Sequence, residues 1–471
     1  MTQLGTEGHP LRVAIIGSGP SAFYAADHLL KQAALVVEVD MFDRLPTPFG
    51  LVRGGVAPDH QKIKTVTKVF NQIASNPRFR FFGYVEYGTD ITHAELAEHY
   101  HQVLYATGAQ TDRTMNIPGE NLIGSHPATE FVAWYNGHPD FRDAKFDLSQ
   151  ERIAVVGVGN VAIDVARILS LSHEELAKTD MADYAIEALS QSKIKEVYLL
   201  GRRGAAQAAF TTPEVKELDE MEESDVIVDP VEAALDPLSA AELERSQDKA
   251  AKKKVEILQG YAQREPAGKG KRLYIRFLVS PVEIVGDQQG RVSKLRMVKN
   301  ELYATDTGSI AARATDQFEE LDVGLVFRSV GYRGVPLPDV PFHERWGVIL
   351  NQKGRVLNPD TNQPLTGEYT AGWIKRGPSG VIGTNKPDAV ETVNCMIEDV
   401  AAGKTWQPSQ PGRDSVEALV RERKPNYVSF ADWQKLDAIE QERGAAEGRP
   451  RVKFTSIADA LAALGRAETV S

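Results

Sequence analysis

The sequence predicts an α/β fold of two similar units, each built on a parallel β-sheet, with the second unit inserted in the first. Two glycine-rich turns predict this fold, because each follows a short apolar run and precedes a segment of helical periodicity. The runs, residues 11–16 and 152–156, are rich in branched side chains, which is typical of strands buried on both faces of a parallel sheet. Two further runs that end at glycine, residues 103–108 and 325–331, are expected to be strands of the same kind.

Length and composition exclude several classes of protein. The chain has 471 residues, 42% of them hydrophobic and 25% charged, which suits two or three globular domains. A net charge of −11 argues against a generally basic nucleic-acid binder. No apolar run reaches the ~18 residues of a membrane-spanning helix, and residues 1–10 do not resemble a signal peptide, so we expect a cytoplasmic protein. The single cysteine, Cys395, excludes an internal disulfide, an internal CxxC pair and a cluster held by several thiolates of this chain.

The first glycine-rich turn, residues 17–22, predicts a dinucleotide cradle. In a G-x-G-x-x-G/A turn the first glycine allows a tight bend, the second lets the backbone approach a pyrophosphate, and the third position keeps helix and strand close. The next strand, residues 35–42, ends in Asp43, which stands 26 positions after Gly17. A carboxylate there can accept the ribose hydroxyl groups and repels an added phosphate, so this cradle suits FAD or NAD.

The second turn, residues 157–162, repeats the pattern with a different acceptor. After a polar, helical insertion at about residues 172–192, the strand 196–200 leads into Arg202 and Arg203. Two guanidinium groups favour a 2′-phosphate, so this cradle suits NADP.

We therefore predict two Rossmann-like dinucleotide-binding domains, the second inserted in the first. The first unit, residues 1–107 and 332–471, is the expected FAD-binding domain and carries a C-terminal extension. The second unit, residues 108–331, is the expected NADP-binding domain. Pro- and Gly-punctuated stretches at 108–150 and 330–345 are the expected crossovers between them.

Two unlike dinucleotide sites in one chain suggest hydride transfer from NADPH to a flavin, which can release electrons singly. A disulfide-reducing flavoprotein would need a cysteine pair, and this chain has none. The cradles leave three acceptors open: a one-electron partner, oxygen or a quinone, and a small organic substrate.

Several segments together resemble adrenodoxin reductase. Besides the two cradles and residues 201–203, they are PFGLVRGGVAPDH at 48–60, FTTPE at 210–214 and AGWIKRGPSGVIGT at 371–384. They occur in order through most of residues 10–400, and the nearest relatives are the bacterial ferredoxin–NADP reductases of this type. The resemblance implies bound FAD, oxidation of NADPH and one-electron delivery to a ferredoxin.

The resemblance also implies which residues contact the cofactors. Many related flavoproteins have an aspartate where Trp373 stands here. The residues expected at FAD are Gly17, Ser18, Gly19, Ala22, Asp43, Leu51 and Val85, with Trp373, Gly380, Val381 and Ile382 at the flavin end. Those expected at NADP are Gly157, Gly159, Asn160, Val161, Ala162, Arg202, Arg203 and Glu214, with Gly380 near the nicotinamide.

The resemblance places a histidine of the 48–60 segment near the flavin and links it with an acidic residue beyond the FTTPE segment. His60 and Glu217 are these residues here, with a role in orienting the nicotinamide or tuning proton uptake, and Asp164 is a weaker candidate. Lys252, Lys253 and Lys254 match a stretch that faces an acidic ferredoxin in the family, where complementary charge speeds encounter. No metal site is expected.

Two other functions remain open. One is a flavin-containing electron-donor subunit of a larger complex, like that of glutamate synthase, although residues 1–10 lack the cysteines that such relatives carry. The other is a redox sensor whose bound nucleotides regulate partner contacts. Salt-sensitive reduction of a ferredoxin would favour the reductase over both.

Overall fold

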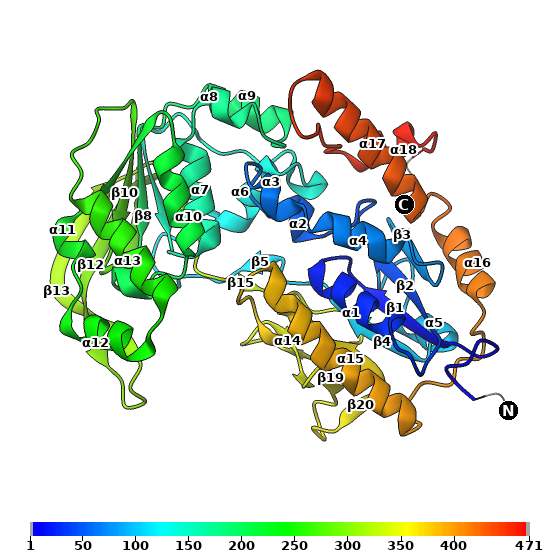
Figure 1. The fold of residues 1–471 in the computed structure, drawn as a ribbon. Coiled ribbons are helices and arrows are strands. Elements are labelled where there is room, and N and C mark those ends of the chain that lie inside the picture. Colours follow the sequence, from blue (N-terminus) through cyan, green and yellow to red (C-terminus); the bar gives the residue numbers. More distant parts are fainter. Residues whose placement is uncertain (1–2, 468–471) are drawn as a thin grey trace.

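The computed structural model describes residues 3–467, which form two open β-sheets flanked by helices (Figure 1). The first sheet has the strand order β18-β19-β20-β4-β1-β2-β3, parallel from β20 to β3 and antiparallel at the β18–β19–β20 edge. Its strands are β1 (Leu11–Ile16), β2 (Val37–Asp43), β3 (Phe79–Gly83), β4 (Gln102–Tyr105), β18 (Asn351–Gln352), β19 (Arg355–Leu357) and β20 (Pro364–Thr370).

The second sheet is parallel throughout, in the order β6-β14-β7-β8-β10-β9. Its strands are β6 (Ser125–Pro127), β7 (Arg152–Val156), β8 (Glu196–Leu200), β9 (Ser224–Val228), β10 (Lys271–Arg276) and β14 (Leu325–Arg328). The predicted α/β fold with parallel sheets is confirmed. The four apolar runs form β1, β4, β7 and β14, and β1 is buried along its whole length, as a strand covered on both faces must be.

Helices cover both sheets. In the first, α1 (Pro20–Leu30) packs against α15 (Asn385–Ala401), and in the second, α7 (Asn160–Ser170) packs against α6 (Ala128–Tyr135). The insertion after α7 contains α8 (His173–Leu176) and α9 (Asp183–Ser190). The remaining helices before residue 380 are α2 (Leu51–Gly54), α3 (Gln61–Lys64), α4 (Thr67–Ala74), α5 (His93–His99), α10 (Thr212–Glu217), α11 (Pro230–Ala233), α12 (Pro237–Ser246), α13 (Lys249–Ala262) and α14 (Trp373–Arg376).

A three-stranded antiparallel sheet, which we did not predict, covers the other face of the second sheet. It consists of β11 (Val279–Gly286), β12 (Val292–Ala304) and β13 (Ile310–Asp322). Its side chains Ile284 and Leu295 share one apolar cluster with Ala154 of β7 and Val326 of β14. The inserted unit therefore consists of a parallel sheet of the dinucleotide-binding type with an additional antiparallel sheet packed on it.

The two crossovers between the sheets pair with each other. The outgoing chain forms β5 (Thr111–Asp112) and the returning chain forms β15 (Tyr332–Arg333), and these strands are antiparallel. A short hairpin of β16 (Phe342–His343) and β17 (Val348–Ile349) follows. The domain limits at 107/108 and 331/332 lie close to this pairing and stay a prediction.

The C-terminal extension runs along the outside of the first unit (Figure 1). It contains α16 (Arg413–Arg423), α17 (Phe430–Ala446) and α18 (Ile457–Ala463). Trp433 and Leu436 of α17 are buried in the core of the first sheet. The loop after α17 reaches the second unit, where Arg449 donates hydrogen bonds to the carbonyl oxygens of Thr179 (3.0 Å) and Met181 (2.5 Å). Among residues 3–467, no helix combines the length and apolarity needed to cross a membrane.

Candidate active site

A cavity of about 1530 Å³ lies where the two units meet. The first unit lines it with the turn after β1, the end of β2, the 48–63 segment and the 380–383 segment. The second unit contributes the start of α7 and α10, and the C-terminal extension contributes Phe454 and Ile457. Ligands of α/β proteins bind in this way, at the carboxyl ends of the strands.

The first cradle has the shape that a pyrophosphate requires. Gly17 has φ +100°, and a Cβ atom there would lie 2.6 Å from the carbonyl oxygen of Ala106, so only glycine fits the bend. Gly19 faces open space instead, with no atom within 4 Å of the position that a Cβ would take. No side chain caps the N-terminus of α1, so its first N–H groups are available to a phosphate. These residues fit the bound FAD that the sequence implies.

Asp43 stands at the cavity wall beside this cradle. It accepts hydrogen bonds from the hydroxyl and the backbone N–H of Ser18 and from the backbone N–H of Leu45. Burial raises the pKa of Asp43, and these hydrogen bonds oppose that rise. The Val85 N–H donates to the Asp43 carbonyl (2.9 Å), which sets both residues at the same end of the cavity.

Another part of the first-unit wall is largely apolar. It is lined by Leu51, Trp373, Gly380, Val381 and Ile382, whose contact with the flavin stays a prediction. The indole N–H of Trp373 donates to the Ser379 carbonyl (3.2 Å), and its ring lies 5.5 Å from the ring of Tyr332. Tyr332 also lines the cavity and was not predicted, because no motif marks it.

The second cradle repeats the geometry of the first. Gly157 has φ +131° and a Cβ atom there would collide with the Ser329 carbonyl oxygen, whereas Gly159 faces open space. The N-terminus of α7 again has no side-chain cap. Asn160 accepts a hydrogen bond from the Thr211 N–H (2.9 Å), which joins this cradle to the 210–214 segment. These residues fit the adenosine and pyrophosphate part of NADP.

The arginine pair after β8 lies on the surface beyond the cavity wall. The carbonyl oxygens of Arg202 and Arg203 accept hydrogen bonds from the Asn300 side chain (2.9 Å) and the Leu278 N–H (3.2 Å), which fix the turn. Neither guanidinium has a hydrogen bond or ion pair to another residue of the 3–467 range. Both are therefore available to an anionic ligand.

Two predicted contacts are wrong. Ala22 and Ala162 are fully buried and lie outside the cavity wall, so they cannot touch the cofactors as we expected. Their small side chains instead let α1 and α7 pack closely on the strands.

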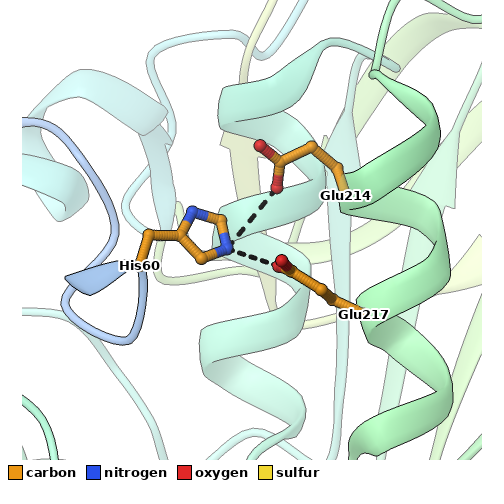
Figure 2. Close-up of side chains that lie close together, drawn as sticks. All are labelled: His60, Glu214 and Glu217. Atoms are coloured by element: carbon orange, nitrogen blue, oxygen red, sulfur yellow. Dashed lines mark hydrogen bonds and ion pairs between the residues drawn. The ribbon is translucent and has the colours of Figure 1, made fainter. Parts of the chain in front are cut away.

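His60, Glu214 and Glu217, which all line the cavity, lie close together (Figure 2). His60 precedes α3 in the first unit, and both glutamates project from α10 in the second, three positions apart on one helix face. His60 Nε2 lies 2.6 Å from Glu217 Oε2 and 3.6 Å from Glu214 Oε2. His60 and Glu214 are buried, whereas the Glu217 side chain is 39% exposed.

Three further charged groups surround this cluster. Arg167, which was not predicted, forms a bidentate pair with Asp59 (2.9 and 3.0 Å) and lies 3.0 Å from Asp164 Oδ1. Asp164 in turn lies 3.9 Å from His60 Nδ1. Arg167 and Asp164 occupy adjacent turns of α7, and only the packing of the two units brings Asp59 and His60 to them.

The cluster shifts the titration of its members. Burial acts to lower the pKa of His60, but the hydrogen bond to Glu217 and the charges of Asp164 and Asp59 outweigh it, so the net pKa is raised. The same hydrogen bond lowers the pKa of Glu217. Burial raises the pKa of Asp164 to about 7 although Arg167 opposes it. Such shifts are typical of functional sites.

The predicted lysine patch is wrong in one member. Lys254 is buried, donates a hydrogen bond to the Ala208 carbonyl and lies over the Phe210 ring, so it cannot face a partner. Lys253 is exposed and pairs with Glu256 (3.0 Å), and Lys252 is half-buried. The run lies on α13, where successive residues point in different directions.

Known proteins resemble this chain over nearly its whole length. The model of the pyridine nucleotide-disulphide oxidoreductase family matches residues 11–228. The NADPH-ferredoxin reductase FprA of Mycobacterium tuberculosis is 48% identical over 460 residues, 96% of this chain and 98% of the relative. The mitochondrial NADPH:adrenodoxin oxidoreductase of Arabidopsis thaliana is 40% identical over 464 residues, 96% of this chain and 95% of the relative. The solved structure of M. tuberculosis FprA in complex with NADPH superposes with a TM-score of 0.91 at 47% identity, covering 97% of this chain and all of the other.

Proposed function

Since this chain belongs to the adrenodoxin reductase-type ferredoxin–NADP reductases, we propose that it oxidises NADPH and delivers the electrons singly to a ferredoxin. One observation carries this proposal: the first glycine cradle and the start of α7, which follows the second cradle, line one cavity where the two units meet, and the two cradles differ in the chemistry of their adenosine ends. When bound, FAD supplies the redox chemistry, because a flavin accepts a hydride and releases electrons one at a time.

The first unit holds FAD. Gly17 and Gly19 leave room for the pyrophosphate, the carboxylate of Asp43 accepts the ribose hydroxyl groups, and Ser18 keeps that carboxylate oriented. The apolar wall formed by Leu51, Trp373 and residues 380–382 excludes water from the flavin end.

The second unit holds NADPH. Arg202 and Arg203 bind the 2′-phosphate, the turn at 157–162 binds the pyrophosphate, and Asn160 and Glu214 direct the remaining part of the molecule into the cavity. In this arrangement the adenosine end would lie at the surface beside Arg202 and Arg203, and the reactive end would enter the cavity.

His60 and Glu217 act as positioning residues in this proposal. Their hydrogen bond joins the two units at the point where the nicotinamide is expected and holds a proton at His60 Nε2. Hydride transfer itself needs no protein acid or base, so the pair orients the ring rather than performing the chemistry.

Partner docking rests on charge. The ferredoxins are acidic iron–sulfur proteins in the family resemblance, and Lys252 and Lys253 of α13 are the members of the predicted patch that retain solvent contact. Complementary charge of this kind raises the encounter rate and makes it sensitive to salt.

An anaerobic titration tests the function. NADPH added to the holoenzyme should bleach the flavin absorbance, and an oxidised ferredoxin should restore it in two one-electron steps, more slowly as salt rises. A holoenzyme that NADPH bleaches but that no ferredoxin re-oxidises at low salt would contradict the proposal. Failure of NADPH to bleach the flavin would contradict it at the first step.

A further inference from the structure

We propose that the cluster of His60, Glu214 and Glu217 is also a binding site for a zinc-class divalent cation. Their three ligand atoms lie within 4.8 Å of one another and converge from opposite sides of the cavity (Figure 2). One imidazole nitrogen with two carboxylate oxygens is a ligand set typical of Zn²⁺ in proteins. The sequence could not show this site, because 154 positions separate His60 from Glu214.

The distances suit a metal ion after one small movement. Zn²⁺ holds nitrogen and oxygen ligands at about 2.0–2.1 Å, which sets tetrahedral ligand atoms about 3.3 Å apart. His60 Nε2 and Glu214 Oε2 are already 3.6 Å apart. The 2.6 Å separation of His60 Nε2 and Glu217 Oε2 must widen, and the partly exposed Glu217 side chain has the freedom to do so. Because the Glu217 side chain is partly exposed, an ion can reach the cluster from solvent. A water molecule can then serve as the fourth ligand.

The surrounding charges favour a dication. Asp59 and Asp164 add two carboxyl groups to those of Glu214 and Glu217, against the single guanidinium of Arg167. In the present arrangement a hydrogen bond between His60 and Glu217 occupies the place that the ion would take.

Asp164 gives a second observation at this cluster. Its buried Oδ1 atom forms an ion pair with Arg167 Nη2 (3.0 Å), receives no hydrogen bond of good geometry from residues 3–467, and lies 3.9 Å from His60 Nδ1. A histidine that ligates a metal through one nitrogen commonly donates its other N–H to a carboxylate, which fixes the ring. Asp164 is placed to be that carboxylate.

Binding has a structural consequence. His60 belongs to the first unit and both glutamates to the second, so the ion would bridge the two units. If the proposed function holds, the ion also competes with the nicotinamide end of NADP for this part of the cavity. Zinc would then act as a reversible inhibitor, removed by a chelator.

Calorimetric titration of the oxidised holoenzyme with buffered ZnCl₂, without NADPH, tests the site independently of turnover. We expect one ion per chain, with affinity at least about tenfold weaker in His60→Gln and in Glu214→Gln, since even outer-shell changes cost that much at metal sites. Glu220→Gln, an exposed glutamate just beyond α10, is the matched control and should bind zinc as the wild type does. Mg²⁺ should not bind, because it prefers all-oxygen ligands.

X-ray absorption at the zinc edge provides the second measurement and should show an imidazole ligand in the wild type that is absent in His60→Gln. Wild-type protein that takes up no zinc, or a His60→Gln variant that binds it unchanged, would overturn the proposal. Loss of ferredoxin reduction with zinc binding intact would instead contradict only the proposed function.

Discussion

The imidazole of His60 and the carboxylate of Glu217 are 2.6 Å apart although 157 positions separate them in the chain. Each comes from a different unit, so their contact depends on the relative orientation of the two sheets. Close by, Arg167 and Asp59 form a second pair between the units. This part of the cavity wall is thus assembled by ion pairs that exist only when the two units are docked.

Alanine substitutions at Gly19 and Gly159, which both face open space, should each weaken the binding of one nucleotide. Gly19 (φ −79°) and Gly159 (φ −95°) have backbone angles that alanine adopts without strain, and each faces free space. Gly19→Ala should therefore fold but lose FAD, because the methyl group fills the pyrophosphate site. Gly159→Ala should keep FAD and bind NADPH at least about tenfold more weakly, a change of ~1.4 kcal/mol. Flavin content and NADPH titration measure the two effects, and equal loss of both nucleotides in either variant would contradict the assignment.

The arginine pair should distinguish NADPH from NADH. A charge-assisted contact to the 2′-phosphate contributes about 1.5–3 kcal/mol in total, so Arg202→Ala with Arg203→Ala should raise the Kd of NADPH roughly tenfold to a hundredfold. NADH binding should change little. Arg291→Ala, an exposed arginine of the same unit that pairs with Asp287, is the control. Equal losses for both nucleotides would refute the 2′-phosphate contact.

His60→Gln and Glu217→Gln should each slow flavin reduction by NADPH about tenfold without abolishing it, since an effect of ~1.4 kcal/mol on the barrier suits a positioning role. Because the two side chains act through one hydrogen bond, the double variant should be little slower than either single variant. Stopped-flow measurement of flavin bleaching tests this. Fully additive losses would show that the two residues act independently.

Substitutions of the α13 lysines should distinguish a role in ferredoxin docking from a role in protein stability. Lys252→Ala with Lys253→Ala should slow ferredoxin reduction at low salt and leave reduction of a neutral dye unchanged. Lys254→Ala should lower the melting temperature instead, because its buried amine holds the Ala208 carbonyl beneath the 210–214 segment. If the rates of ferredoxin reduction and dye reduction fall equally in the double variant, Lys252 and Lys253 have a structural role rather than a docking role.

A buried charge cluster between the second unit and the C-terminal extension predicts unequal losses of stability for two substitutions. Asp180 lies 2.7 Å from Lys64 and 3.3 Å from Lys453, and all three are nearly inaccessible to water. Asp180→Asn should cost about 3–5 kcal/mol, because it leaves two buried lysines without their counter-ion. Lys453→Met should cost much less, because Asp180 keeps Lys64. Thermal unfolding of the two variants measures the difference, and a larger loss of stability in Lys453→Met than in Asp180→Asn would contradict this account.

The sequence by itself determined the two cradles, the opposite chemistry of Asp43 and the arginine pair, and the parallel character of the sheets, because each is read from a short stretch in which the residues concerned lie within about 45 positions of one another. It also singled out His60 and Glu217, but only through a family resemblance. The antiparallel layer β11–β13, the inward direction of Lys254 and the roles of Arg167 and Tyr332 were decided by the tertiary structure. The physical reason is that a local motif fixes the backbone geometry of its own residues. A long-range ion pair or ring contact instead requires two elements to dock, and docking depends on the whole buried surface rather than on any short sequence pattern.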